Sequence, residues 1–157
     1  MKDVNIYIYT EYTGNMKSGT GKYHVILETM IQDKKGKIIP WTNVDGRNPK
    51  PIIGFEDNIT KNRLELLALK ESLEHMVKPS RIIIHTSSEY VVNAFIQGWP
   101  DKWAKNGFKS GKKEIKHADL WKKVIEQTEQ HDITFMKASI TPYMKAQALE
   151  LKNLKEK

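Results

Sequence analysis

The sequence predicts an α/β fold in which a five-stranded mixed sheet is flanked by helices. Two observations support this prediction. The opening part of the chain shows the period of two that is typical of strands, and the rest alternates helical patterns with β-branched runs. At 157 residues the chain is long enough to bury one continuous core, so we expect a single domain over residues 1–157.

Three antiparallel strands are predicted at the start of the chain. Apolar side chains alternate with polar or aromatic ones over residues 4–9, which predicts the first strand. Glycines punctuate residues 14–21, which we interpret as a turn, and the β-branched and aromatic run 23–31 predicts the second strand. The turn at residues 33–36 predicts a hairpin onto a third strand over residues 38–41.

The middle of the chain predicts a loop, a helix and a buried strand. Residues 43–58 contain prolines and glycines without a sustained period, so we interpret them as a loop. Thr60 is suited to cap an amphipathic helix that ends before Pro79. The β-branched run 81–86 then predicts a buried central strand.

The last part of the chain is predicted to be mostly helical. A helix after a serine cap is predicted over residues 88–98, followed by a short helix over 99–106 and a lysine-rich loop over 108–116. A further helix over 120–128, a fifth strand over 133–135 and a terminal helix over 142–151 complete the chain.

The charge of the chain favours a polyanionic partner. The formal net charge is +7 and the sequence pI is about 9.4. Residues 99–123 contain eight lysines and three acidic residues, so most of the excess lies in one segment. Cysteine is absent, which excludes disulfides and thiolate zinc sites, and no apolar run is long enough for a signal peptide or a membrane span. We expect a cytoplasmic monomer without a membrane partner.

Three short segments resemble motifs of the bacterial type 1 ribonuclease H family, in the same order and with matching spacing. Residues 60–66 resemble T-N-N-R-x-E-L, residues 86–91 resemble T-D-S-x-Y-V, and residues 116–121 resemble K-N-x-D-L-W. The resemblance extends from about Val4 to Leu151. It implies a ribonuclease H-like fold and an enzyme that cuts the RNA strand of an RNA–DNA hybrid with Mg²⁺ or Mn²⁺.

The resemblance also implies four carboxylates, which in this family hold two metal ions at the scissile phosphate. Two of the positions carry a carboxylate here, at Glu11, where the family has aspartate, and at Glu65. The alternative interpretation of Glu11 is an exposed acidic residue in a loop. The alternative interpretation of Glu65 is an acidic residue on a solvated helix face.

The other two family positions lack a carboxylate. The third falls on Ser87, and the fourth falls on Ala148 or Leu149, depending on one gap. Glu89 begins a helix, where it suits the helix dipole, and we interpret Glu150 as a surface acid. We therefore expect impaired nuclease activity and, at most, weak binding of one ion through Glu11 and Glu65.

The lysine-rich segment resembles the family's handle, a protrusion that grips the DNA strand of the hybrid. We call residues 99–116 the handle. The residues expected to contact nucleic acid are Asn15, Asn62, Trp99, Trp103, Lys105, Lys109, Lys112 and Lys113. The alternative is that the aromatic residues seat the handle on the core while the lysines keep it soluble.

These patterns leave three functional hypotheses. The first is a ribonuclease H-like domain that binds RNA–DNA hybrid or duplex with impaired nuclease activity. The second is an active ribonuclease H with a rearranged site that uses Glu11, Glu65 and either Glu89 or Glu150. The third is a protein-interaction domain whose basic face meets an acidic partner. Hybrid cleavage separates the first two, and salt-dependent binding to nucleic acid separates both from the third.

Overall fold

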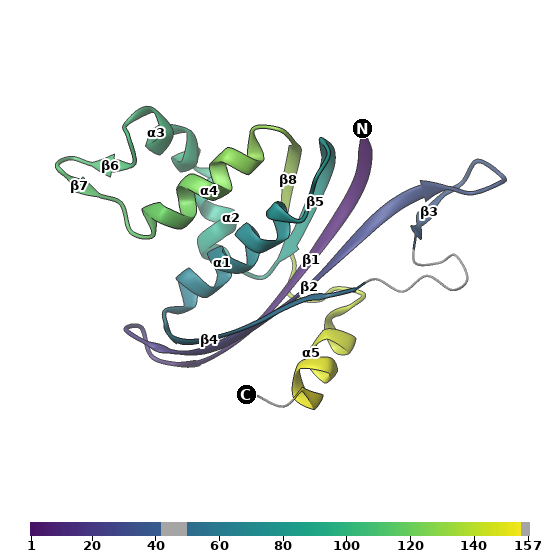
Figure 1. The fold of residues 1–157 in the computed structure, drawn as a ribbon, viewed down its shortest axis with the longest axis horizontal. Coiled ribbons are helices and arrows are strands. Elements are labelled where there is room, and N and C mark those ends of the chain that lie inside the picture. Colours follow the sequence, from purple (N-terminus) through teal and green to yellow (C-terminus); the bar gives the residue numbers. More distant parts are fainter. Residues whose placement is uncertain (42–49, 155–157) are drawn as a thin grey trace.

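Six strands form the main sheet, in the order β3-β2-β1-β5-β8, with β4 also paired to β2 (Figure 1). The computed structural model describes residues 1–41 and 50–154. The strands are β1 (Lys2–Gly14), β2 (Gly19–Gln32), β3 (Ile38–Pro40), β4 (Ile52–Ile59), β5 (Ser80–Thr86) and β8 (Asp132–Lys137). Strand β2 is antiparallel to β1, β3 and β4, whereas β5 is parallel to both β1 and β8. The sheet is therefore mixed, as predicted, but it has six strands rather than the five expected, because β4 also pairs with β2.

Helices cover both faces of this sheet. They are α1 (Lys61–Glu74), α2 (Glu89–Ile96), α3 (Trp99–Lys105), α4 (Ala118–Thr128) and α5 (Met144–Asn153). Helices α1 to α4 lie on one face and α5 lies on the other (Figure 1). The predicted caps are present, because the side chain of Thr60 accepts a hydrogen bond from the Arg63 backbone N–H and Ser88 caps α2 in the same way.

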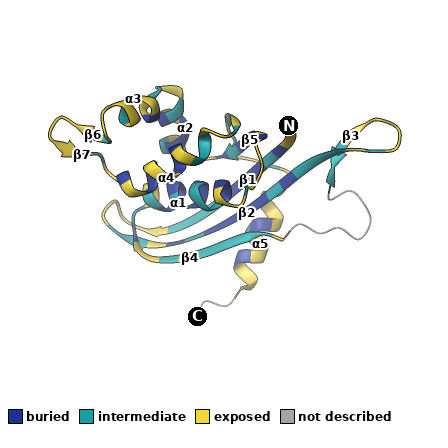
Figure 2. Cartoon of the chain, turned by 45° about the horizontal axis from the view of Figure 1, so that its top comes forward, coloured by how far each residue is buried: buried dark blue, intermediate teal, exposed yellow. Residues whose placement is uncertain are grey.

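The core lies between the sheet and the helices α1 and α4. Ile6 of β1 and Ile84 of β5 are fully buried against the leucine stripe of α1, and Trp121 of α4 is also fully buried. Buried positions line the contact between these helices and the sheet, while the handle and the β2–β3 turn are exposed (Figure 2). Within the described ranges, no helix is long and apolar enough to cross a membrane.

The interpretation of residues 43–58 as a loop is wrong for its second half, where β4 is a strand paired with β2. Residues 42–49 lie outside the described residues. The period of β4 is hidden because most of its side chains are only partly buried, and because Gly54 stands under the ring of Tyr23. A Cβ atom at Gly54 would lie 2.2 Å from that ring, so the position excludes a side chain that would reveal a strand.

The predicted turn over residues 14–21 is also too long, because β2 already begins at Gly19. Gly21 belongs to this strand, and a Cβ atom there would lie 2.4 Å from the side chain of Leu64 in α1. Gly21 thus allows α1 to approach the sheet closely, which a single sequence does not distinguish from a turn glycine. In the handle, the predicted loop contains a short hairpin of β6 (Lys109–Ser110) and β7 (Lys113–Glu114).

Candidate functional site

An open pocket of about 570 Å³ lies where the carboxyl end of β5 meets the first turns of α1 and α2. We call it the Glu65 pocket. It is lined by Lys61, Asn62, Glu65, Ser87, Glu89, Tyr90, Asn93 and Trp99. Four of the residues predicted from the sequence, Asn62, Glu65, Ser87 and Trp99, are therefore brought together although they come from separate parts of the chain.

Glu65 is buried in the wall of this pocket, with 6% of its surface exposed. Its Oε1 accepts a hydrogen bond of 3.0 Å from Ser88 Oγ, which also caps α2 by accepting from the Val91 backbone N–H. Burial raises the pKa of the Glu65 carboxyl, and the hydrogen bond from Ser88 offsets part of that shift. The interpretation of Glu65 as part of a solvated helix face is therefore wrong.

Glu11 lies within β1, opposite Lys22 of β2, rather than in a loop. It is half-buried and its Oε2 accepts a hydrogen bond of 2.7 Å from the Tyr9 hydroxyl. Burial, together with this hydrogen bond and the charge of Glu11, raises the pKa of Tyr9 to about 12. Glu11 is not among the residues that line the Glu65 pocket.

Ser87 directly follows β5 and is exposed at the mouth of the pocket. Two residues later, Glu89 accepts a hydrogen bond from Lys137 Nζ, and this contact lowers the pKa of Glu89. Sequence reasoning missed Lys137. The signal was available, because Lys137 ends β8, which runs parallel to β5 and places Lys137 opposite Thr86. Carboxyl ends of neighbouring parallel strands meet at one edge of a sheet.

Helix α5 contains Ala148 and Leu149, the two residues on which the sequence comparison with the family placed the fourth position, and it is bound to the sheet by buried polar contacts. The Gln147 amide donates to the backbone carbonyls of Tyr7 and His24, at 3.1 and 3.0 Å. Ala148 is half-buried beside Gln147, whereas Leu149 is 58% exposed. The orientation of the helix therefore makes position 148, rather than 149, the one at the margin of the interface.

Glu150 is partly exposed, as expected of a surface acid, but it also has a specific partner. Its Oε2 lies 3.0 Å from Nε2 of His24, a residue of β2 that is 1% exposed. The side chain of Glu150 is 47% exposed. This carboxylate therefore contributes to the attachment of α5 to the sheet.

The donor set does not fit a two-ion centre. Among residues 1–41 and 50–154, no three His, Cys, Asp or Glu side chains gather in a way that could hold a metal ion. Two carboxylates line the Glu65 pocket, and both already have protein partners, Ser88 for Glu65 and Lys137 for Glu89. A hydroxyl at Ser87 supplies no charge to offset the repulsion between two dications.

The aromatic residues of the handle divide between two roles. Trp103 packs against the buried Trp121 with ring centroids 5.1 Å apart, and Lys122 lies over the ring of Phe108. These two aromatic residues seat the handle on α4. Trp99 is instead 41% exposed and lines the Glu65 pocket, so its ring is open to a ligand.

The lysines of the handle are exposed. They include the four that were predicted to contact nucleic acid, Lys105, Lys109, Lys112 and Lys113. The last three surround a turn at Gly111, whose φ of 67° is in the left-handed region that favours glycine. The handle therefore presents its positive charge at the end of a short hairpin.

The two asparagines lie in different surroundings. Asn62 is exposed in the first turn of α1 and lines the Glu65 pocket. Asn15 is exposed between β1 and β2, where its Oδ1 accepts from the backbone N–H groups of Lys17 and Ser18. The side chain of Asn15 thus shapes a turn, and it does not line the pocket.

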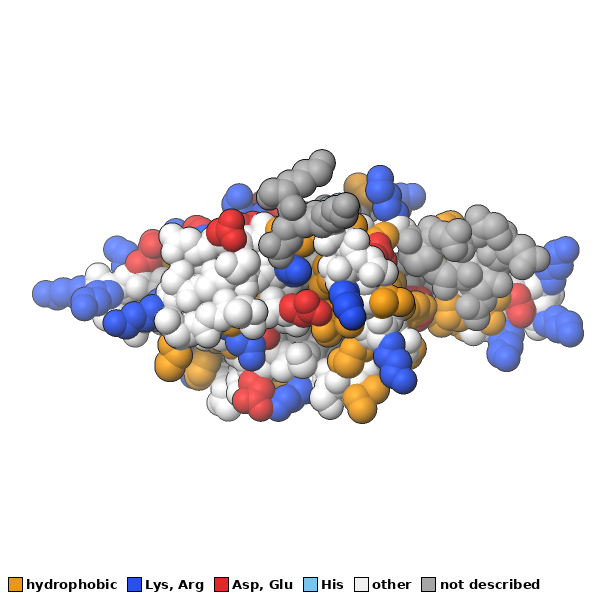
Figure 3. Space-filling model, turned by 90° about the horizontal axis from the view of Figure 1, so that it is seen from below, with side chains coloured by type: hydrophobic (Ala, Val, Ile, Leu, Met, Phe, Trp, Pro, Cys, Tyr) orange, Lys and Arg blue, Asp and Glu red, His pale blue; other side chains and the backbone are white. Residues whose placement is uncertain are grey.

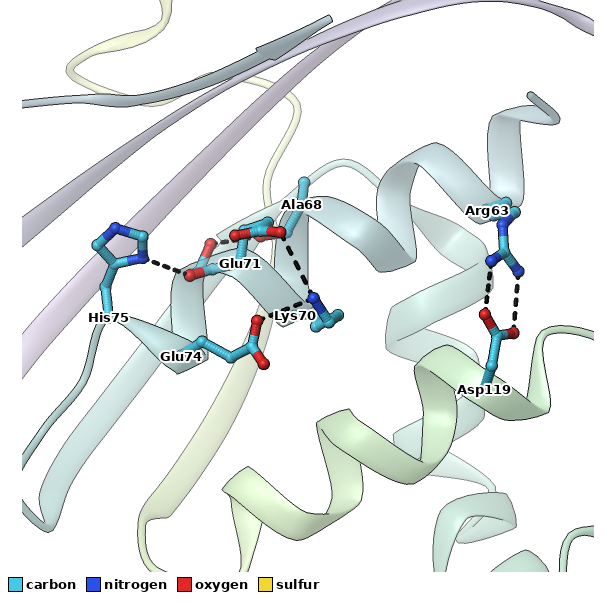
Figure 4. A network of polar contacts seen from close by, with 8 residues as sticks. Arg63, Ala68, Lys70, Glu71, Glu74, His75 and Asp119 are labelled. Carbon is cyan, nitrogen blue, oxygen red and sulfur yellow. Dashed lines mark hydrogen bonds and ion pairs between the residues drawn. The ribbon is translucent and has the colours of Figure 1, made fainter. Parts of the chain in front are cut away.

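An ion pair joins two of the sequence motifs (Figure 4). Arg63 of α1 donates two hydrogen bonds to Asp119 in the first turn of α4, at 3.1 and 2.6 Å. These hydrogen bonds lower the pKa of Asp119 to about 2. The pair joins the first turn of α1 to the first turn of α4.

The mixed sheet, its helical layers and the pocket at the end of β5 define a ribonuclease H-like domain. The sequence model of the family described as RNase H matches residues 3–139. A ribonuclease H of Acetivibrio thermocellus is 33% identical over 138 residues, which cover 87% of this chain and 82% of that protein. The chain belongs to the ribonuclease H family.

Other relatives match over a shorter range. A ribonuclease H of Thermoanaerobacter sp. strain X514 is 42% identical over 89 residues, which cover 56% of this chain and 57% of that protein. The match therefore spans little more than half the length of such relatives.

Solved structures show the same fold at low identity. The crystal structure of LC9-RNase H1, described as a type 1 RNase H with the type 2 active-site motif, gives a TM-score of 0.71 at 20% identity and covers 96% of this chain and 70% of that one. LC11-RNase H1 in complex with RNA/DNA hybrid gives a TM-score of 0.50 at 16% identity, with 90% and 92% coverage. Both comparisons concern the fold alone.

Proposed function

We propose that this chain binds RNA–DNA hybrid or duplex through the Glu65 pocket and the handle, and that its nuclease activity is impaired. The observation that carries the proposal is a pocket at the end of β5 that has Ser87 rather than a carboxylate there, and that is lined by Trp99, the first residue of the lysine-rich handle. The pocket offers an exposed indole and amides, and the handle offers cations. Impairment follows from the missing carboxylates.

Three features support the binding part. The lysines at the handle turn are exposed and available to phosphates, which supply most of the affinity in nucleic-acid complexes. Trp99 is open to sugars or bases at the pocket. The relative LC11-RNase H1, which has this fold, was crystallised with RNA/DNA hybrid.

The impairment is supported by electrostatics. A dication and a carboxylate about 4 Å apart attract each other by about 8 kcal/mol at an effective dielectric constant of about 20, before hydration is subtracted. Even about 3 kcal/mol of net stabilisation per ligand corresponds to about a hundredfold in affinity. Because two of the four family ligands are replaced, we expect at most weak binding of one Mg²⁺ or Mn²⁺ ion, through Glu11 and Glu65.

The test of binding uses a handle variant, Lys109→Ala/Lys112→Ala/Lys113→Ala. We expect it to bind hybrid more weakly and to flatten the slope of log affinity against log salt by about two to three units. The matched control is Lys78→Ala/Lys145→Ala/Lys152→Ala, which removes the same charge from exposed positions outside the handle. If both variants keep the slope of the natural chain, the handle is not part of the interface.

The test of impairment is cleavage of a fluorescent hybrid with Mg²⁺ and with Mn²⁺, compared with an active member of the family under the same conditions. We expect much slower cleavage by this chain. The site would be functional if this chain cleaved the hybrid as fast as the active enzyme and if Glu65→Ala abolished that cleavage.

Such a result would support the second candidate, an active ribonuclease H with a rearranged site. One observation favours it. LC9-RNase H1 is described as a type 1 RNase H with the type 2 active-site motif, so this fold accommodates more than one motif. In this chain the rearranged set would consist of Glu11, Glu65 and either Glu89 or Glu150.

A further inference from the structure

The protein carries two lysine-bearing hairpins, at opposite ends of its longest axis (Figure 1). One is the β6–β7 hairpin of the handle, which turns at Gly111. The other connects β2 to β3 and turns at Gly36, whose φ of 84° is also in the left-handed region. We call residues 33–37 the distal tip. It contains Lys34, Lys35 and Lys37, and all three are exposed.

The backbone of the distal tip is fixed by its own hydrogen bonds. Oδ1 of Asp33 accepts from the backbone N–H groups of Lys35 and Lys37, at 2.9 Å each. The backbone N–H of Asp33 donates to the Lys37 carbonyl, and that of Gly36 donates to the Asp33 carbonyl. The lysines are therefore displayed on an ordered turn, which reduces the entropy lost when a partner binds.

The positive charge of the distal tip has no ion-pair partner among residues 1–41 and 50–154. Three lysines and one aspartate give the tip a net charge of +2. Figure 3 shows Lys and Arg side chains at both ends of the molecule, and the handle and the tip contribute these ends.

The distal tip does not contribute to the core. No residue from 33 to 37 is buried, and Ile38 at the start of β3 is 56% exposed. Strand β3 pairs with β2 over only three residues. Because core packing does not account for this projecting hairpin, its exposed cations are the feature that it presents to other molecules.

We propose that the distal tip is a second contact for the phosphate backbone of a nucleic-acid duplex, so that a long duplex touches both the handle and the tip. This inference rests on the proposed function of the handle. The partner class follows from chemistry, because both hairpins display three exposed lysines around a turn, an arrangement suited to a regular array of phosphates.

The length of β2 gives a scale for the size of the duplex. At about 3.3 Å per residue, its 14 residues span about 45 Å. Strand β2 ends at the distal tip, and the handle lies at the opposite end of the longest axis, off the line of β2 (Figure 1). With a rise of about 3.4 Å per base pair, the length of β2 corresponds to about 13 base pairs, so we expect hybrids well above that length, and not shorter ones, to contact both hairpins.

The test compares GC-rich hybrids of about 10 and about 24 base pairs, bound in EDTA so that no cleavage occurs. The tip variant is Lys34→Ala/Lys35→Ala/Lys37→Ala. We expect it to flatten the salt slope of the long hybrid by about two to three units and to leave the short hybrid unchanged. The control variant Lys34→Arg/Lys35→Arg/Lys37→Arg keeps the charge and should keep the salt slope of the natural chain. Thermal melting at the same temperature as the natural chain would show that the fold of each variant is intact.

Two controls distinguish the possible failures. If Lys78→Ala/Lys145→Ala/Lys152→Ala lowers the long-hybrid slope equally, the effect is net charge alone and the inference is wrong. The inference is also wrong if the tip variant keeps the salt slope of the natural chain on the long hybrid. It is wrong as well if the tip variant loses affinity only for polyglutamate, a polymer that mimics an acidic protein. If the handle variant nevertheless binds both hybrids more weakly than the natural chain, the proposed function stands without the tip. If the handle variant changes neither hybrid, the proposed function fails as well.

Discussion

Restoring the missing carboxylates provides the sharpest test of the impaired site. The variant Ser87→Asp/Ala148→Asp places an acid after β5 and another on α5. Ser87 is exposed in the wall that also contains Glu65, so an aspartate there needs no repacking. On α5, Gln147 is buried and Leu149 is 58% exposed, which makes Ala148 the better position.

The expected gain follows from the charge of the ion. Each carboxylate within about 4 Å of a dication offers about 8 kcal/mol of gross attraction at an effective dielectric constant of about 20. If about 3 kcal/mol of this remains after desolvation, each substitution raises the affinity for Mn²⁺ by about a hundredfold. Two cations compete with the ion: Lys137, which binds Glu89 from the neighbouring strand β8, and Lys61, which lines the same pocket as Ser87. Lys137→Ala should raise the affinity further.

Mn²⁺ titration followed by electron paramagnetic resonance measures this affinity directly, and hybrid cleavage measures its consequence. Ser87→Asn/Ala148→Asn is the matched control, because it adds side chains of the same shape without charge. Ser87→Asp/Leu149→Asp tests the other register. The reasoning is refuted if neither aspartate pair binds Mn²⁺ more tightly than the asparagine control.

Two further predictions concern contacts that hold the site together. Gln147→Leu should lower the free energy of unfolding by about 1–3 kcal/mol, because the backbone carbonyls of Tyr7 and His24 lose the amide donor of Gln147. An unchanged midpoint in chemical denaturation would contradict this prediction. The Arg63–Asp119 pair should stabilise the fold above pH about 4, and this contribution should disappear as the pH falls through about 2, because the folded pKa of Asp119 lies below its ordinary value of 3.8. Because the pair is partly exposed, Asp119→Asn should lower the free energy of unfolding by only about 0.5–1 kcal/mol near neutral pH, and by less toward pH about 2. Thermal melts that show the same loss of stability at both pH values would argue against the ion pair.

The fold could be predicted from the sequence because its strongest signals are local. Thr60 and Ser88 cap their helices, and the leucine stripe of α1 is buried, as side-chain type and period indicated. Strand β4 could not be predicted in this way. Its side chains are mostly half-buried, and Gly54 resembles a loop residue until the ring of Tyr23 is seen above it.

The same division holds for the candidate site. The sequence by itself determined which carboxylates are present, at Glu11 and Glu65, and that Ser87 has none, because these are properties of residue type. Only the tertiary structure decided what each group contacts. Glu65 binds Ser88, and Lys137 reaches Glu89 from a neighbouring strand, so both partners depend on how β5, β8 and the helices pack. Pairings between residues that are distant in the chain leave no local period, and they are fixed by the packing of the whole sheet.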